Sequence, residues 1–291
     1  MTNLVPYVAT PRPGLAGFVM VTLAAASWGT WSLFLRPTHL PAIVTSPIIF
    51  LMMGVVGLPF ALRGPRSLWD RTTVGLVAAN AALDALNVLG FFAAIQYTTV
   101  AIAVLCHYLA PILIALAAPR IDRVVSRGAR PAAAVALLGL VIILEPWQAP
   151  ASGAVLGALL GVGSAVCYAG NVFVVRRVAA RLGAARAQAY HSLLAGVVMA
   201  PLLIGHTGEL TGAGLALLGA GAATIGAASG VAFSLGLLRI GSARTAVLTF
   251  AEPIVAVTVG AVVWGEPLHP IAMLGAALVL GAGLQVARKA R

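Results

Sequence analysis

Two acidic side chains lie within long apolar segments of this sequence, and they are the residues best suited to chemistry inside a membrane. Asp84 and Glu252 are each surrounded mainly by aliphatic residues. A carboxyl group near the centre of a bilayer costs about 2.5 to 3.5 kcal/mol on insertion scales, so we expect it to face a cavity or a partner. Such a group can bind the amine of a substrate or carry a proton. Transport without ion coupling is equally compatible with the sequence.

Asp84 belongs to a polar stripe with helical spacing. Asn80, Asp84, Asn87 and Phe91 follow at i, i+4, i+7 and i+11, so a helix places them on one face. One interpretation is a cavity wall that contacts the amino or carboxyl group of a substrate. The other is a set of interhelical hydrogen bonds that holds a helix bundle together. Both interpretations are kept open here.

Glu252 and His107 lie beside prolines at matching places in the chain. Glu252 directly precedes Pro253, and His107 lies one turn before Pro111, at the position that corresponds to Thr249. Proline lacks the backbone donor of a helix and interrupts its hydrogen bonds. Glu252 is therefore either part of a helix break or a site for a proton or a substrate amine. His107 is either a packed, hydrogen-bonded residue or a substrate contact.

Aromatic side chains form a second group of candidates. Trp28 and Trp31 are three residues apart, and Tyr168 and Asn171 have the same spacing about 140 residues later. Such side chains could form the walls of a cavity for a flat apolar ligand. The competing interpretation is a belt of tryptophans at the membrane interface. Further candidates for the same cavity are Tyr108, Tyr190 and His191.

The composition shows which elements must position these residues. Hydrophobic residues are 61% and charged residues 9% of 291 positions, whereas a soluble domain is about half apolar and one quarter charged. A helix of about 20 apolar residues crosses the hydrocarbon of a bilayer. The sequence predicts ten such spans, and it leaves no room for a soluble domain. The predicted spans are residues 15–35, 42–62, 73–95, 98–118, 131–147, 153–175, 187–205, 213–238, 243–264 and 268–287.

The distribution of positive charge predicts the orientation of these spans. Seventeen of the 18 Lys and Arg residues fall in the terminal segments and in alternate loops, and only Arg36 falls on the opposite side. Because Lys and Arg collect in cytoplasmic loops, both termini are predicted to lie in the cytoplasm of a bacterium, with the chain in its inner membrane. The net charge of +11 does not indicate nucleic acid, since the charges lie between apolar runs rather than on one folded surface.

The sequence also repeats itself with an offset of about 140 residues. Residues 27–36 match residues 167–176, and residues 107–112 match residues 249–254. Five spans per repeat is an odd number, so the two units have opposite orientations in the membrane, as in many secondary transporters. We therefore predict an all-α membrane protein of two units, residues 1–150 and residues 151–291, around a central cavity.

These features resemble a known family. Ten spans, a five-plus-five repeat, a proline in the fourth span of each half and the run EPIVAVTVGAVVWGEPL at residues 252–268 resemble the EamA branch of the drug/metabolite transporters. The overall layout and the tryptophans of the first span are most similar to bacterial exporters of aromatic amino acids, the YddG type. The resemblance implies a basket of helices with spans 5 and 10 at its periphery, and alternating access between the halves. The first half departs from the pattern, because Ala110 stands where the second half has Glu252.

Other classes of protein find less support. Cys106 and Cys167 lie in apolar segments and indicate neither a disulfide framework nor a zinc site. Because we find no nucleotide-hydrolysis motif and no His-rich or paired-carboxylate cluster, we predict no catalytic residue, metal or cofactor, and no enzyme. The prediction is a secondary exporter of amino acids, aromatic ones above all, or of related small metabolites. Alternatives are a broad exporter of drugs or cationic metabolites, a membrane-embedded lipid enzyme, and a channel or structural subunit. Monomer and homodimer are both left open.

Overall fold

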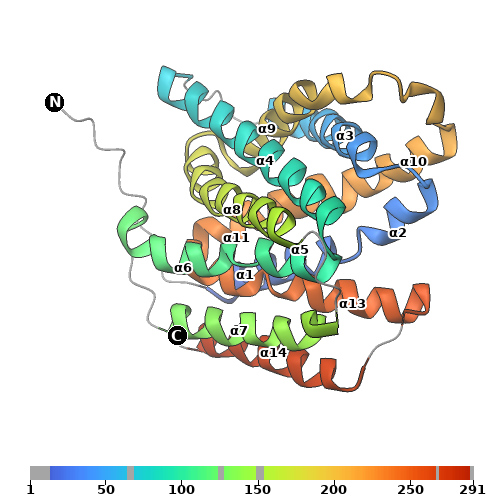
Figure 1. The fold of residues 1–291 in the computed structure, drawn as a ribbon. Coiled ribbons are helices and arrows are strands. Elements are labelled where there is room, and N and C mark those ends of the chain that lie inside the picture. The colour runs from blue at the N-terminus through green and yellow to red at the C-terminus, as the bar shows by residue number, and fades with distance from the viewer. Residues whose placement is uncertain (1–13, 64–68, 124–127, 149–153, 267–268, 289–291) are drawn as a thin grey trace.

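The computed structural model describes residues 14–63, 69–123, 128–148, 154–266 and 269–288, and every regular element within these ranges is helical (Figure 1). The first half contains α1 (Leu15–Trp28), α2 (Ser32–Leu35), η1 (Arg36–Thr38), α3 (Ala42–Arg63), α4 (Arg71–Tyr97), α5 (Val100–His107), α6 (Ala110–Ile121), α7 (Ala129–Leu144) and η2 (Pro146–Gln148). The second half contains α8 (Ala154–Leu182), α9 (Ala184–Met199), η3 (Ala200–Leu203), η4 (Thr207–Glu209), α10 (Gly212–Gly221), the π-helical η5 (Ala222–Ala228), α11 (Ser229–Ile240), α12 (Ser242–Leu248), α13 (Ala251–Trp264) and α14 (Ile271–Arg288).

Each predicted span coincides with helical structure, which confirms an all-helical protein that crosses a membrane several times. Eight helical stretches of the described residues are long and apolar enough to cross a bilayer. The other two predicted spans correspond to α7 and α9, which have 16 residues each. The count of ten crossings therefore stays a prediction.

One predicted boundary is wrong by seven residues. The sixth span was expected to end at residue 175, but α8 continues to Leu182 and includes Arg176 and Arg181. Arg, Ala, Val and Leu all tolerate a helix, and the chain turns only at Gly183, whose φ of 84° favours glycine. The basic residues expected in a loop therefore lie on a helix that extends past the apolar segment.

The prolines of the fourth and ninth predicted spans divide each of them into two helices. α5 ends at His107 and α6 begins at Ala110, while α12 ends at Leu248 and α13 begins at Ala251. The first span is interrupted as well, at Gly29 to Trp31. A Cβ atom on Gly29 would overlap the carbonyl oxygen of Glu252 and lie 2.8 Å from the amide nitrogen of Ala256. Only glycine permits this close approach of the first span to α13.

The helices pack in matched pairs across the two halves. α4 packs along α8, and α1 packs along α11, while α3 lies against α9 and α6 against α12. α7 and α14 lie side by side along one edge of the bundle (Figure 1). This arrangement agrees with the expectation that spans 5 and 10 are peripheral.

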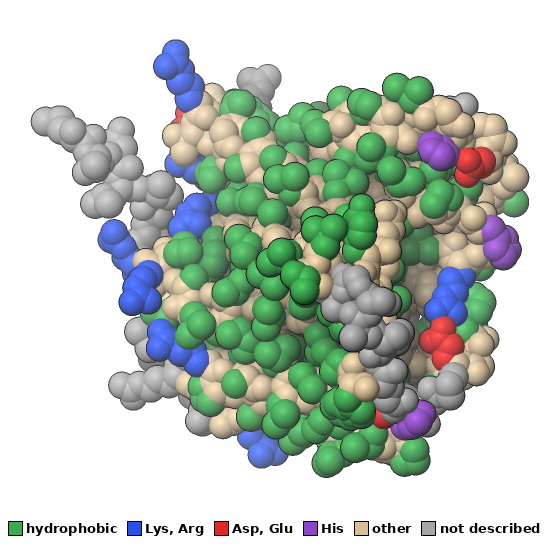
Figure 2. Space-filling view, viewed as in Figure 1, with side chains coloured by type: hydrophobic (Ala, Val, Ile, Leu, Met, Phe, Trp, Pro, Cys, Tyr) green, Lys and Arg blue, Asp and Glu red, His purple; other side chains and the backbone are tan. Residues whose placement is uncertain are grey.

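The surface has the character of a membrane protein. Large aliphatic side chains such as Val155, Val262 and Met273 are more than 70% exposed, and apolar side chains cover the middle of the molecule in Figure 2. A surface this apolar suits contact with lipid. Most Lys and Arg side chains gather on the left of Figure 2, and we call this the basic end of the molecule. Toward the opposite end, the surface in Figure 2 is hollowed beside a touching pair of acidic and basic side chains.

Candidate functional site

Two polar stripes face each other where α4 and α8 pack. Asn80 Nδ2 donates to Asn171 Oδ1 at 2.6 Å, and Ser164 Oγ donates to the backbone and side-chain oxygens of Asn87 at 2.9 and 2.8 Å. These contacts are buried. Asn80 and Asn87 of the predicted stripe on α4 thus form interhelical hydrogen bonds, as one of the two interpretations required. Asp84 lies between them, where no hydrogen bond to α8 is recorded.

Asp84 has its hydrogen-bonding partner on a third helix. Its Oδ2 atom is 3.1 Å from Nε2 of His191 on α9. His191 is buried, with 7% of its side chain exposed, and its ring makes an edge contact with Phe50 of α3. The Asp84 side chain keeps 19% of its surface exposed. The carboxylate of the pair is therefore partly accessible, whereas the imidazole is buried.

His107, the last residue of α5, stands at the centre of an aromatic cluster. The centre of its ring lies 5.0 Å from that of Phe91, 5.4 Å from that of Tyr108 and 5.5 Å from that of Tyr168. Its Nδ1 atom is 2.9 Å from Ser164 Oγ. Because that hydroxyl already donates to Asn87, it accepts from His107 and so fixes the tautomer with a proton on Nδ1. The Nε2 atom is then an acceptor, and no described residue donates to it.

Tyr108 and Tyr168 join this cluster to the two carboxyl groups. The Tyr108 side chain interacts with that of Glu252, and its ring packs 5.5 Å from that of the fully buried Phe250. Tyr168 interacts electrostatically with both Glu252 and Asp84. A continuous polar and aromatic track therefore crosses the interior from α13 through α5 and α8 to α4 and α9. We call this track, which comprises Asp84, His107, Tyr108, Tyr168, His191 and Glu252, the central track.

Trp28 lies beside the central track, but its indole N–H is occupied. It donates to the carbonyl oxygen of Ile225 at 3.1 Å, and the neighbouring Ser27 hydrogen-bonds with Ser229 at 2.7 Å. The two contacts join the interrupted first span to the π-helical η5 and to the first residue of α11. A π-helical turn leaves carbonyl groups out of the usual helical pattern, and such turns are frequent at functional sites. Trp28 thus offers only its ring, which packs 5.0 Å from that of Phe233.

The side chains of three other candidates make their recorded contacts outside this track. Trp31 packs in a separate apolar cluster with Val44 and Ile48 of α3, so the two tryptophans do not share one wall. Tyr190 packs against Trp69 at 5.3 Å. The hydroxyl of Thr249 donates to the carbonyl oxygen of Ala246 in its own helix and is buried. No group of three His, Cys, Asp or Glu side chains able to hold a metal occurs among the described residues.

Ser164 and Phe250 contribute to this region but were not among the predicted residues. Ser164, Tyr168 and Asn171 have the spacing i, i+4 and i+7, the same as Asn80, Asp84 and Asn87. This second stripe was detectable as a pattern of polar residues in the sixth span. Phe250 carries no such signal, because one more aromatic residue in an apolar run is unremarkable.

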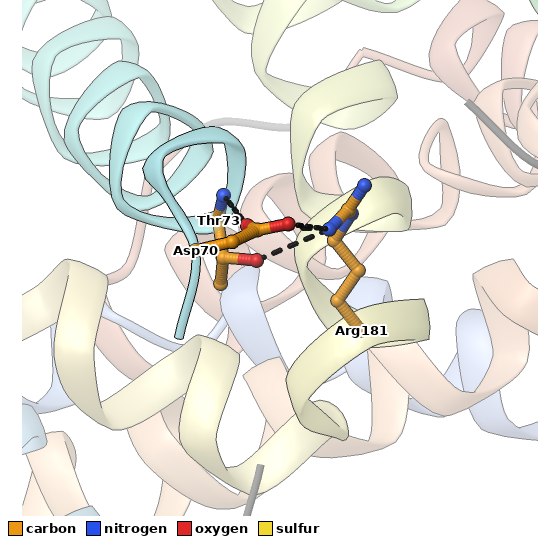
Figure 3. Close-up of polar contacts among 3 residues, drawn as sticks. All are labelled: Asp70, Thr73 and Arg181. Carbon is orange, nitrogen blue, oxygen red and sulfur yellow. Dashed lines mark hydrogen bonds and ion pairs between the residues drawn. The ribbon is translucent and has the colours of Figure 1, made fainter. Parts of the chain in front are cut away.

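Ion pairs connect helices at both ends of the bundle. At the basic end, Arg176 of α8 pairs with Asp122 at 2.9 Å, and both side chains are buried. Arg181, one turn further along α8, pairs with Asp70 at 3.2 Å, and Asp70 also accepts from the Thr73 amide at the start of α4 (Figure 3). Hydrogen bonds from Thr73, together with Arg181, hold the pKa of the Asp70 carboxyl below its ordinary value. At the other end, Arg36 pairs with Glu266 and lies over the Trp264 ring.

Comparison with known proteins relates this arrangement to transporters. A model of the EamA-like transporter family matches residues 155–286, in the second half of the chain. A protein of Archaeoglobus fulgidus, described as an uncharacterized transporter, is 28% identical over 275 residues, which cover 93% of this chain and 96% of that protein. Both likenesses are to transporters, in agreement with the membrane-spanning helices described above.

A solved structure shows that the whole chain shares one known fold. A crystal structure superposes with a TM-score of 0.79 over 97% of this chain and all of that one, at 20% identity. The residues that match the family model therefore belong to a larger helical fold that includes the first half of the chain.

Proposed function

We propose that this protein is a secondary exporter of amino acids, aromatic ones above all, or of closely related metabolites. The observation that carries the proposal is the central track, an aromatic cluster with a carboxyl group on either side, enclosed by helices with an apolar outer surface. An aromatic ring suits the faces of Tyr108, Tyr168 and His107, and an ammonium group suits Asp84 or Glu252. The bacterial inner membrane, with both termini in the cytoplasm, is part of this proposal.

Alternating access follows from two inverted units, residues 1–150 and 151–291. The helix packing supports this part of the proposal, because an exchange of the two halves turns several contacts between helices into one another. The packing of α4 on α8 becomes that of α11 on α1, and the contact of α6 with α8 becomes that of α13 with α1. The proline breaks after His107 and Leu248 correspond as well. A substrate bound between the halves could then be exposed to either side as they rock.

A cationic metabolite or drug is the second candidate substrate, and the charges of the track favour it. The track holds two carboxyl groups, and within the described chain no Lys or Arg side chain hydrogen-bonds with any of its members. A ligand with an ammonium group and no carboxylate would leave fewer groups without a partner. The carboxylate of an amino acid would depend on neutral hydrogen-bond donors.

Transport by purified protein in liposomes separates these candidates. The vesicles are loaded with unlabelled substrate, and counterflow of labelled phenylalanine, threonine or a lipophilic cation is measured. We expect phenylalanine to exchange fastest, with saturation. Tyr168→Ala should lower its counterflow about ten-fold, since the loss of one aromatic contact is worth about 0.5 to 1.5 kcal/mol.

Trp147→Ala is the matched control, because this aromatic side chain is 60% exposed and has no recorded contact with a member of the central track. It should exchange phenylalanine like the unaltered protein. Exchange of the cation alone would favour the second candidate, and exchange of none of the three probes would refute both.

A further inference from the structure

The hydrogen positions of the Asp84 and His191 pair follow from its contacts. Nδ1 of His191 is 2.8 Å from the carbonyl oxygen of Ala187. A carbonyl only accepts, so Nδ1 carries a hydrogen. Nε2 is 3.1 Å from Oδ2 of Asp84, and that hydrogen bond needs one further proton, on the nitrogen or on the oxygen. The pair therefore holds one more proton than a carboxylate and a neutral imidazole would.

Loss of that proton would break the contact. The lone pair of Nε2 would then face a carboxylate oxygen across 3.1 Å, with no hydrogen between them. The ring is held in place by Ala187 and Phe50, so it does not turn away easily. Asp84 would have to find another cation or hydrogen-bond donor. Because 19% of the Asp84 side chain is exposed, such a cation can reach it.

The surroundings of the pair supply no alternative cation. α3 has its charged residue, Arg63, at its last position, and Arg239 of α11 is held near the end of that helix by Met20 and Leu235. α8 contributes Tyr168, which interacts with Asp84 and with Glu252 beyond it. α9 brings Tyr190 next to His191, and the ring of Tyr190 packs against Trp69. The other titratable groups of α4 and α9 lie near the ends of those helices, and η3 has no charged residue. His191 is thus the one described cation-forming partner of Asp84.

We propose that Asp84 and His191 form a proton-binding site, and that its proton exchanges with the ammonium group of the substrate. One carboxylate then serves two cations in turn. When the ammonium group binds Asp84, the proton shared by Nε2 and Oδ2 passes to water. The imidazole is then neutral, and its Nδ1–H still donates to the carbonyl oxygen of Ala187. When the substrate leaves, a proton from water returns to the pair. The inference rests on the proposed function, since it requires a substrate with an amine.

Proteoliposomes with a pH gradient test this exchange. The protein is reconstituted, and uptake of labelled phenylalanine is measured with the vesicle interior acidic and again with equal pH on both sides. One-for-one exchange predicts about ten-fold accumulation per pH unit. His191→Gln should abolish accumulation but retain counterflow at equal pH. Asp84→Asn should abolish accumulation and weaken counterflow as well.

His206→Gln is the control. His206 also pairs with a carboxylate, Glu209, but both side chains are more than one third exposed and lie in the described outer connection between α9 and α10. It should accumulate phenylalanine like the unaltered protein. Counterflow at equal pH also shows that each variant is folded, so a loss of accumulation alone reports on the proton.

Calorimetry of phenylalanine binding in detergent gives a second measurement. Titrations in two buffers with different ionisation enthalpies count the protons released, and we expect about one for the unaltered protein and none for His191→Gln. Accumulation by His191→Gln equal to that of the unaltered protein would overturn the proton site. Counterflow without any accumulation by the unaltered protein would overturn it too, while leaving the exporter intact. Absence of phenylalanine counterflow would instead refute the proposed substrate.

Discussion

The same kind of ion pair occurs at both ends of the molecule, in two different environments. Arg176 and Asp122 join α8 to the end of α6, with 6% and 5% of their side chains exposed. Arg36 and Glu266 join the end of the first span to the end of α13, with 49% and 48% exposed. Arg36 and Arg176 are 140 residues apart and occupy matching positions of the repeat. The two halves of the repeat thus form equivalent ion pairs, and only the pair at the basic end, Arg176 with Asp122, is shielded from solvent.

The difference in burial indicates which end is sealed. Removing charges from water is costly, so a buried pair persists only where the surrounding helices close over it. Even so, two hydrogen-bond donors of Arg176 are unsatisfied, because its Nε and Nη2 atoms are buried without a hydrogen-bond partner. Water could reach those atoms if α8 and α6 separated. We infer that the basic end is closed in this conformation, and that the pair at the other end lies at an open mouth.

The largest predicted effect comes from breaking the buried pair. Asp122→Asn leaves the Arg176 charge buried without a counter-ion, which should lower the free energy of unfolding by about 3 to 5 kcal/mol. The variant should also spend more time open at the basic end. Thermal unfolding in detergent measures the first effect, and labelling of Cys167 from that side measures the second. Unchanged stability would show that the pair is solvated in the membrane.

A smaller effect is expected where the first span meets α13. Gly29→Ala forces its new methyl group against the backbone of Glu252 and Ala256. Overpacking of this kind typically costs about 1 to 3 kcal/mol. The contact lies between the two ion pairs, so the variant should also slow transport by separating the helices. Gly163→Ala is the control, because a Cβ atom there meets nothing within 4 Å. Equal behaviour of the two variants would contradict the close approach at Gly29.

The exposed pair should matter little for stability. Glu266→Gln removes an ion pair in contact with solvent, and such pairs contribute about 0 to 1 kcal/mol. We expect almost no change in the midpoint of unfolding, but faster opening of this end and a counterflow rate that no longer depends on salt concentration. A loss of stability as large as that of Asp122→Asn would remove the distinction between the two ends.

These pairs also show what could not be read from the sequence. The helices follow from composition and spacing, because a bilayer demands long apolar runs and Pro and Gly interrupt them. The stripe on α4 was correctly placed on one face. Its partners were not predictable, since Asn171 and Ser164 are 91 and 77 residues away and only packing decides which helix they meet. Arg36 and Glu266, 230 residues apart, were invisible for the same reason.

The smallest effect is expected at Asp70, which gives the basic end a second, exposed pair to compare with the buried one (Figure 3). Hydrogen bonds from Thr73 and the charge of Arg181 lower the pKa of this carboxyl below the ordinary 3.8. A lowered pKa in the folded state stabilises the fold above the unfolded value, and the stabilisation is lost as the pH falls through the folded value. Asp70→Asn keeps a side chain that can cap α4 but removes the charge. The unaltered protein and the variant should therefore differ slightly in unfolding midpoint at neutral pH and converge as the pH falls below 3.8. A difference that persists in acid would mean that capping geometry, rather than the charge on Asp70, connects α4 to α8.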